Sequence, residues 1–268
     1  LILRKGKNYF DKDIWKWSLC YCLPLVFHTL SLTILLQADR IMLSSLYSLS
    51  ESGIYSFIYN ITLVLGVLIS ALENTWKTWF FNNYEMTEIV TIQKRLQLFV
   101  TVAILGIAVY VLIAPDLVRI FATEEYHTQM YLIGPIALAY IISFFYDFPV
   151  YLEYKKNATK YIAISSLIAA VVNIILNYFM IPILGGLGAA ITTLISYTIQ
   201  FVLHMVVSNR LEKKLFTFRL FAPYFVMGLA VFAIFMLVVN TYIPRYVLAV
   251  ATAVAFFAYI YKNKKLLI

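Results

Sequence analysis

The sequence predicts an all-α membrane protein: a polytopic bundle of eight transmembrane helices with both chain ends in the cytoplasm. Composition points to lipid, because 63% of the 268 residues are hydrophobic and only 13% are charged. Soluble domains average about 45–50% apolar and about 25% charged residues. Apolar runs of about 20 residues, the length that crosses a bilayer, recur along the chain without strand-like alternation. An ordinary soluble domain and a β-barrel are therefore excluded.

Charged residues, prolines and glycines bound each apolar run and define the spans. We expect helices at residues 17–37, 54–75, 97–115, 129–149, 160–181, 186–207, 220–239 and 244–261. Gly185, Gly186 and Gly188 follow Pro182, a pattern typical of a tight turn between two antiparallel spans.

The cations predict the orientation of these spans. Of the 21 Lys and Arg residues, only Arg40, Arg119 and Arg245 fall in the loops of one side. Short loops rich in Lys and Arg stay in the cytoplasm, so the other side is predicted to be cytoplasmic. The net charge of +8 is scattered between apolar runs rather than gathered on one face, and we expect no nucleic-acid partner.

Polar residues recur every fourth position on four spans, and residues at that interval share one helical face. Because polar groups are costly in lipid, such faces line a wet cavity or pack helix against helix. We expect these polar seams to face one aqueous hollow, with the seventh and eighth spans outside it. The polar seams are Thr29, Thr33 and Gln37, beside His28 and Asp39; Thr62, Gly66, Ser70 and Asn74; Ala169, Asn173 and Asn177; and Gly188, Thr192, Ser196, Gln200 and His204.

Several single polar residues admit two interpretations. Glu73 precedes Lys77 by four residues, which suits either a helical ion pair or an ion-coupling site. Asp147 lies near Lys155 and Lys156, so a structural role at the membrane boundary competes with a functional one. His28 is either a cavity residue or a satisfied buried imidazole.

Motifs for catalysis are absent from the sequence, which has no His-Glu-x-x-His, Gly-x-Ser-x-Gly, phosphate-binding loop or Cys-x-x-Cys. Glu124, Glu125 and His127 form only a loose cluster in a predicted outer loop. Cys20 and Cys22 lie inside one apolar run and are interpreted as packing residues. We expect no enzyme activity, no cofactor and no metal.

Particular residues resemble a known family. Leu23-Pro24-Leu25, then Asp39-Arg40, then Gly53-Ile54-Tyr55-Ser56, and the run NIILNYFMIPILGGLGAAITTLISY over 173–197 are similar to the C-terminal lobe of bacterial polysaccharide repeat-unit flippases. These are O-antigen and capsule exporters of the multidrug/oligosaccharidyl-lipid/polysaccharide superfamily. The resemblance extends over the whole chain. After Trp76 the chain departs from the pattern, with Lys77-Thr78 where relatives often carry Trp-x-Pro.

The resemblance implies fourteen spans in the bacterial plasma membrane, arranged as two six-helix lobes followed by two extra helices. It implies a juxtamembrane segment at 1–16, the C-terminal lobe at 17–207 and the extra helices at 208–268. The chain begins at Leu1 within a basic segment, and we interpret it as a piece of a longer protein whose N-terminal lobe is missing.

The implied function is alternating-access transfer of an undecaprenyl-diphosphate-linked oligosaccharide across the membrane, with membrane lipids as surroundings. We expect Arg40 to contact the anionic group and Asp39 to orient Arg40. Gln37, Asn173 and Asn177 are expected to hydrogen-bond the sugar, and His28 is a further candidate.

Three other functions compete with this interpretation. A cation-coupled multidrug exporter of the same superfamily would use buried carboxylates, for which Asp39, Glu73 and Asp147 are the candidates. A membrane-embedded glycan polymerase or acyltransferase would carry a large loop with catalytic Arg or His residues. A non-transporting assembly scaffold is the third.

Overall fold

The computed structural model describes residues 11–267, apart from the side chains of 265–267, and these residues form an all-α bundle. Residues 1–10 of the predicted segment 1–16, with Arg4, Lys5 and Lys7, lie outside the described part. The long helices are α2 (Lys12–Leu46), α3 (Leu49–Asn83), α4 (Ile89–Phe121), α6 (Ile133–Lys155), α7 (Thr159–Leu184), α8 (Gly186–Leu211), α9 (Phe218–Val238) and α10 (Ile243–Leu267). Three short helices join them: η1 (Tyr84–Met86), α5 (Glu124–His127) and η2 (Met130–Leu132).

Eight helices of the described chain are long and apolar enough to cross a membrane, which confirms the predicted fold class and the number of spans. Several are longer than the predicted spans. Both α2 and α3 have 35 residues, or about 52 Å at 1.5 Å per residue, against a hydrocarbon core of about 30 Å. The helical turns beyond the apolar runs carry charged residues, such as Arg40 in α2 and Lys77 in α3, at which the runs are interrupted.

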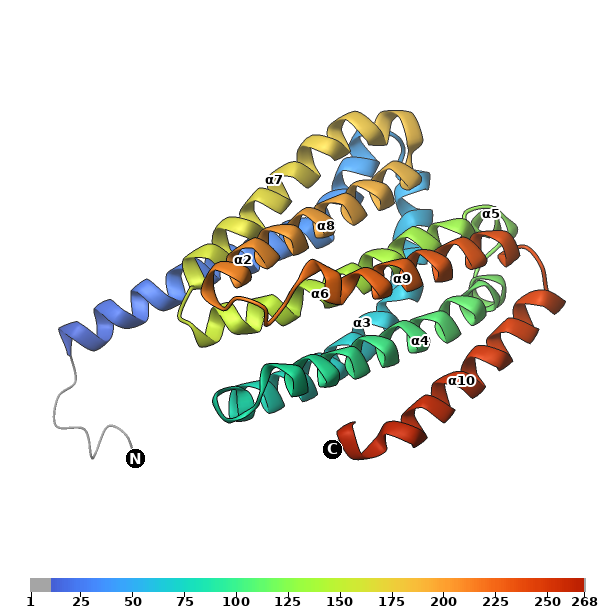
Figure 1. The fold of residues 1–268 in the computed structure, drawn as a ribbon. Helices are drawn as coiled ribbons and strands as arrows, with labels where there is room; N and C mark the ends of the chain where they lie inside the picture. The colour runs from blue at the N-terminus through green and yellow to red at the C-terminus, as the bar shows by residue number, and fades with distance from the viewer. Residues whose placement is uncertain (1–10, 268) are drawn as a thin grey trace, which may run out of the picture.

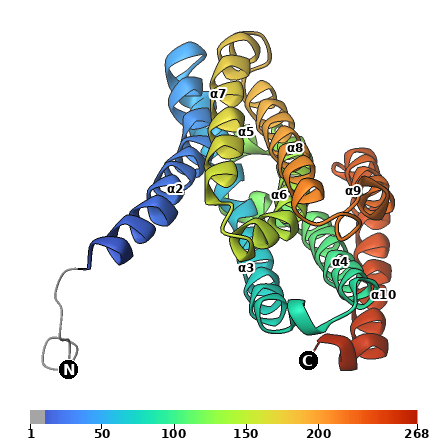
Figure 2. The same cartoon turned by 60° about the vertical axis from the view of Figure 1, so that its left-hand side comes forward.

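Helix α6 lies at the centre of the bundle. Its apolar window is 83% buried, against 17% for α9 and 11% for α10. On one side α6 packs against α8, which pairs with α7, and α7 packs along α2. On the other side α6 contacts α3, α4 and α9, while α10 lies along α4 (Figures 1 and 2).

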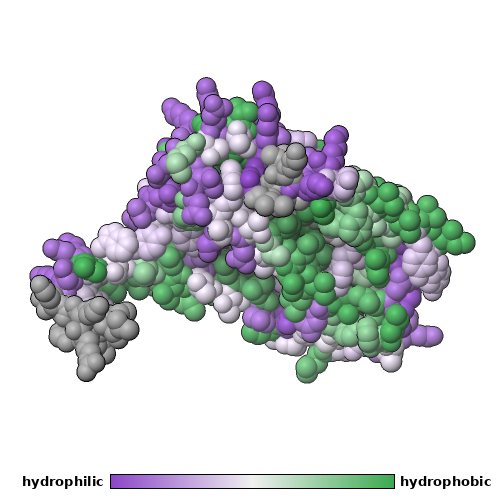
Figure 3. Space-filling model, turned by 90° about the horizontal axis from the view of Figure 1, so that it is seen from below, coloured by the Kyte–Doolittle hydropathy of each residue, from purple (hydrophilic) through white to green (hydrophobic). Residues whose placement is uncertain are grey.

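Hydrophobic side chains cover much of the outer surface, as Figure 3 shows for one face. Large apolar side chains on α7 are exposed, among them Ile175, Phe179 and Ile183. Exposed apolar patches of this kind are rare on soluble monomers. The described chain is therefore a multi-pass membrane protein.

A tight turn joins α7 to α8, as predicted. Gly185 has a φ of +55°, a conformation that costs residues with a Cβ free energy. A Cβ at Gly188 would lie 2.6 Å from the backbone oxygen of Met180. The two glycines thus allow α8 to reverse direction and pack closely on α7.

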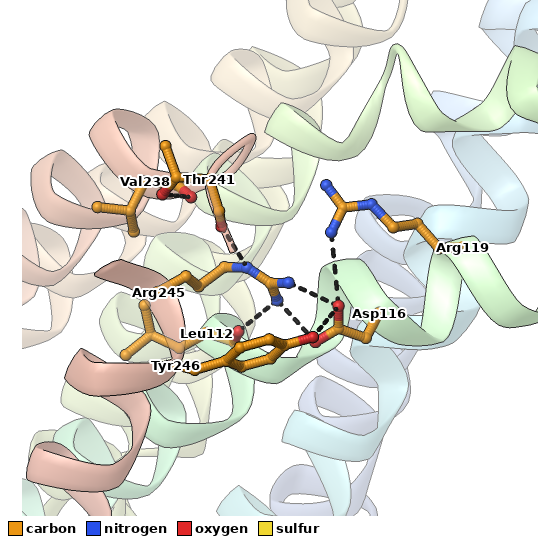
Figure 4. Close-up of polar contacts among 7 residues, drawn as sticks. All are labelled: Leu112, Asp116, Arg119, Val238, Thr241, Arg245 and Tyr246. Atoms are coloured by element: carbon orange, nitrogen blue, oxygen red, sulfur yellow. Dashed lines mark hydrogen bonds and ion pairs between the residues drawn. The ribbon is translucent and has the colours of Figure 1, made fainter. Parts of the chain in front are cut away.

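A buried ion pair holds α10 against α4 (Figure 4). The guanidinium of Arg245 is fully buried and donates two hydrogen bonds to the Asp116 carboxylate, at 2.6 and 2.8 Å, and one to the Leu112 carbonyl. Arg119 approaches the same carboxylate at 3.4 Å, and Tyr246 donates to it at 3.0 Å. All three arginines of the predicted outer side thus lie in helices rather than in loops.

At the opposite end of the bundle, the segments that follow α3, α6 and α8 meet at Glu212. Its carboxylate accepts a hydrogen bond from Tyr84 at 2.7 Å and lies 3.2 Å from the Lys156 amine. The Tyr84 hydrogen bond and the positive charge of Lys156 lower the pKa of Glu212. This cluster ties the ends of α3, α6 and α8 together.

The Arg245–Asp116 pair predicts how substitutions at and near it change the free energy of unfolding. Asp116→Ala leaves the buried guanidinium without its counter-ion, and we expect a loss of about 3 kcal/mol in the free energy of unfolding, the low end for such pairs because the Asp116 side chain is 20% exposed. Adding Arg245→Leu should recover part of the loss, because no charge is then buried alone. Arg119→Ala is the control and should cost at most about 1 kcal/mol. Unfolding in detergent measures all three, and additive losses in the double variant would contradict the interpretation.

Candidate functional site

A hydrophilic hollow of about 440 Å³ lies between α2, α3 and α6, at the end of the bundle where α2 begins and α3 and α6 finish. Its lining is mostly polar or aromatic, which is unusual inside an apolar bundle. We name it the tyrosine-lined hollow; it is lined by Tyr21, His28, Leu32, Glu73, Lys77, Phe81, Tyr146, Asp147, Val150, Tyr151 and Tyr154.

Two carboxyl groups line the tyrosine-lined hollow near each other, Glu73 from α3 and Asp147 from α6. Negative charges on neighbouring carboxylates repel, so a shared proton or a bound cation would stabilise the pair. Lys77 also lines the hollow, and it makes no ion pair with Glu73 within residues 11–267. The local Glu73–Lys77 pair is therefore not formed. Lys155 and Lys156 pair with Glu85 and Glu212 instead of neutralising Asp147.

Asp39 lies near the other end of the bundle, fully enclosed by neighbouring helices. Its carboxylate accepts hydrogen bonds from Tyr55 of α3 at 3.0 Å, from Asn177 of α7 at 2.8 Å and from Thr193 of α8 at 2.6 Å. Asn173 donates to Thr193 and accepts from Asn177. We call these five residues the Asp39 network. Its three donors compensate Asp39 for the loss of water, so the network joins four helices.

Arg40 does not pair with Asp39. Its guanidinium stacks over the Tyr59 ring at 4.6 Å, and one terminal nitrogen donates to Asn60 at 3.4 Å. The expected orienting role of Asp39 toward Arg40 is therefore corrected: Asp39 faces α7 and α8, and Arg40, one residue on, points about 100° around the helix.

The polar seams do not share one hollow, which contradicts the expectation from the sequence. On α2, Thr29, Thr33 and Gln37 are exposed, and both threonine hydroxyls bond to backbone carbonyls of their own helix. The polar seams of α7 and α8 face each other; Thr192, for example, donates to the Asn177 side chain. Close packing, the alternative interpretation, describes α7 and α8 correctly. Only His28 among the predicted site residues lines the tyrosine-lined hollow.

Sequence reasoning missed the tyrosines of α6. The predicted fourth span stops at residue 149, whereas α6 continues to Lys155, so Tyr151 and Tyr154 lie beyond the predicted span. Tyr146, Asp147, Tyr151 and Tyr154 lie on adjoining positions of one helical face. A search for amphipathic spacing beyond the apolar run would have found this face.

The other candidate clusters from the sequence have fewer features of a functional site than the tyrosine-lined hollow. Among residues 11–267, no group of three or more His, Cys, Asp or Glu side chains is arranged to hold a metal ion. His127 contacts the Ala122 carbonyl rather than joining its two neighbouring glutamates. Cys20 and Cys22, predicted to pack inside, are exposed on α2.

No protein-family model, curated protein or solved structure matches this chain.

The Asp39 network predicts that Asn177 acts in folding. Asn177→Leu keeps the branched arrangement of side-chain heavy atoms but removes a donor to a buried carboxylate, and we expect a loss of about 1–3 kcal/mol in the free energy of unfolding. Gln37→Leu, on the exposed face of α2, is the matched control and should change stability little. Equal effects of the two substitutions, measured by unfolding in detergent, would show that the network adds nothing to stability.

Proposed function

We propose that this chain is the C-terminal part of a bacterial plasma-membrane flippase that transfers an undecaprenyl-diphosphate-linked oligosaccharide by alternating access. The family resemblance supplies the substrate class. The observation that carries the proposal is the tyrosine-lined hollow, a polar space inside a bundle whose outer surface is apolar.

The lining of the tyrosine-lined hollow suits a lipid-linked sugar. Tyrosine rings offer flat faces and hydroxyl groups to a pyranose, and carboxylates accept hydrogen bonds from sugar hydroxyls. Lys77, which has no ion-pair partner among the described residues, offers a positive charge to a diphosphate. In this proposal Glu73, Asp147 and His28 contact the sugar. The predicted orientation opens the hollow toward the cytoplasm, where lipid-linked sugars are assembled.

The outer face of α2 supports the proposal that the N-terminal lobe of the complete protein faces this helix. Only 17% of the apolar window of α2 is buried, yet this helix exposes Gln37 and leaves Arg40 half-exposed. Lipid is a poor neighbour for such groups. A facing lobe with a wet cleft between would accept them, with Gln37 and Arg40 contacting sugar and phosphate from the cleft.

In this proposal, an apolar groove of about 330 Å³ between α2 and α7 holds the lipid tail of the substrate. Leu23, Pro24 and Phe27 of α2 line it together with Ile164 and Leu167 of α7. The same helix, α2, therefore borders both a polar hollow and an apolar groove, the two surroundings that an amphipathic substrate requires.

The Glu73–Asp147 pair favours a second candidate, a cation-coupled multidrug exporter of the same superfamily. Two neighbouring carboxyl groups suit a proton or another cation, which such an exporter exchanges for its drug. The two candidates differ in cargo charge: the flippase takes an anionic lipid, whereas the exporter takes organic cations.

If the chain belongs to a flippase, removing the negative charges of the tyrosine-lined hollow should reduce glycan export. In the complete protein, Glu73→Gln combined with Asp147→Asn should lower surface polysaccharide at least tenfold with the protein still present in the membrane, because each amide has only one acceptor oxygen and no charge to strengthen its hydrogen bond to the sugar. Labelled surface glycan and membrane immunoblots measure the two quantities.

The matched control is Glu85→Gln, which removes an exposed carboxylate outside the hollow and should leave export unchanged. Normal surface glycan in the double variant would refute a role for the hollow in glycan export. Retained glycan together with lost resistance to cationic drugs would favour the multidrug exporter.

A further inference from the structure

A second pair of titratable residues lies inside the bundle, away from the tyrosine-lined hollow. Glu153 of α6 and His204 of α8 are both fully buried, and His204 Nδ1 lies 2.9 Å from Glu153 Oε1. The Tyr146 ring stacks on the imidazole at 5.7 Å. Within residues 11–267, no Lys or Arg side chain forms an ion pair with Glu153.

Charge balance determines how many protons this pair binds. A carboxylate beside a neutral imidazole has a net charge of −1, which is unfavourable in the low-dielectric interior of the bundle. One additional proton, on either partner, makes the pair neutral overall. The buried pair therefore holds that proton, whereas exposed side chains of the unfolded chain release it above about pH 6.5.

Unsatisfied polar atoms surround the pair. Glu153 Oε2, His204 Nε2, Gln200 Oε1 and Ser208 Oγ are all buried and lack a hydrogen-bond partner among the described residues. Gln200, His204 and Ser208 recur every fourth residue, so they share one face of α8, with side chains about 5–6 Å apart. That spacing suits bridging water, and buried polar atoms without protein partners are usually satisfied by water.

A chain of hydrogen bonds leads from this face to the tyrosine-lined hollow. Gln200 donates to Ser166 of α7 at 3.0 Å, and the Ser166 hydroxyl lies 2.6 Å from His28 Nδ1. His28 lines the hollow. Hydroxyl, imidazole and water can relay protons, and the Gln200 side chain positions Ser166.

We propose that Glu153 and His204 form a buried proton-binding site with ordered water, and that His28, Ser166 and Gln200 connect it to the tyrosine-lined hollow. A metal ion is a poorer occupant, because the pair supplies only two of the ligands that an ion requires. The described titratable groups that interact with the pair are Tyr146 beside the imidazole, Tyr154 on α6 and His28 on α2. The site concerns proton binding by the chain itself, whichever cargo the hollow takes.

The first test compares unfolding at several pH values for the full chain in detergent. Because the folded pair retains a proton that the unfolded chain releases, the equilibrium constant for unfolding should rise about tenfold per pH unit above about pH 6.5, relative to a variant with Glu153→Gln and His204→Gln. That variant replaces the pair by two neutral amides that hydrogen-bond each other. Glu212→Gln, at the end of the bundle and away from the pair, is the control and should keep the native pH dependence above about pH 6.5. An identical pH dependence in the native chain and the double variant would overturn the site.

A second measurement does not require that the double variant folds. The chain has three histidines, so His28→Gln combined with His127→Gln leaves His204 as the only imidazole. Nitrogen NMR of labelled histidine should then show no titration of His204 between pH 5 and pH 8. A midpoint near pH 6.5, the value of an exposed imidazole, would contradict the proposal.

The connection to the hollow has its own test. In a chain with His127→Gln, Ser166→Ala should leave the pH dependence of unfolding unchanged and slow proton exchange at the His204 ring by at least tenfold, because the hydroxyl between Gln200 and His28 is lost. Thr198→Ala is the matched control, because its hydroxyl bonds only to the Leu194 carbonyl of its own helix. Equal exchange rates in the two variants would exclude this path.

Discussion

Polar side chains inside a membrane bundle must find their hydrogen-bond partners within the protein, and this constraint shapes the association of α2, α6, α7 and α8. Lipid supplies no water to an unpaired carboxylate or amide. Asp39 consequently bonds to side chains from three other helices. Toward the opposite end, His28 and Gln200 meet at Ser166, and Glu153 meets His204. Each contact removes an unsatisfied group from both helices at once, so the polar groups set the pairing and register of the helices.

The same constraint separates the two kinds of polar residue in this protein. Groups with partners on neighbouring helices, such as Asn173 and Asn177, are fully buried and belong to the framework. A second class of polar groups borders the tyrosine-lined hollow or the exposed face of α2. Lys77 and Gln37 belong to this second class, and they are the groups available to a cargo or to a facing lobe. Burial and partner identity, rather than polarity, distinguish the two roles.

Apolar run lengths predicted eight helices correctly, because the thickness of a bilayer requires about 20 apolar residues per span whatever the helices pack against. Helix ends were predicted less well. Residues such as Lys12, Thr78 and Lys155 continue their helices into polar turns, where hydropathy does not distinguish a helix from a loop. The tyrosine face of α6 was missed for this reason. The four-residue spacing of Asn173 and Asn177 correctly identified a shared face, but spacing does not indicate what that face contacts.

The sequence by itself determined the solvent, the secondary structure and the number of spans, because these depend on local composition and on the fixed rise of an α-helix. Only the tertiary structure decided which polar faces meet. It paired Asp39 with Asn177, 138 residues away along the chain, rather than with its neighbour Arg40, and it brought Glu73 and Asp147 together from two helices. Such contacts depend on helix rotation and on the choice of neighbouring helix, which are set by the packing of the whole bundle and not by any single segment.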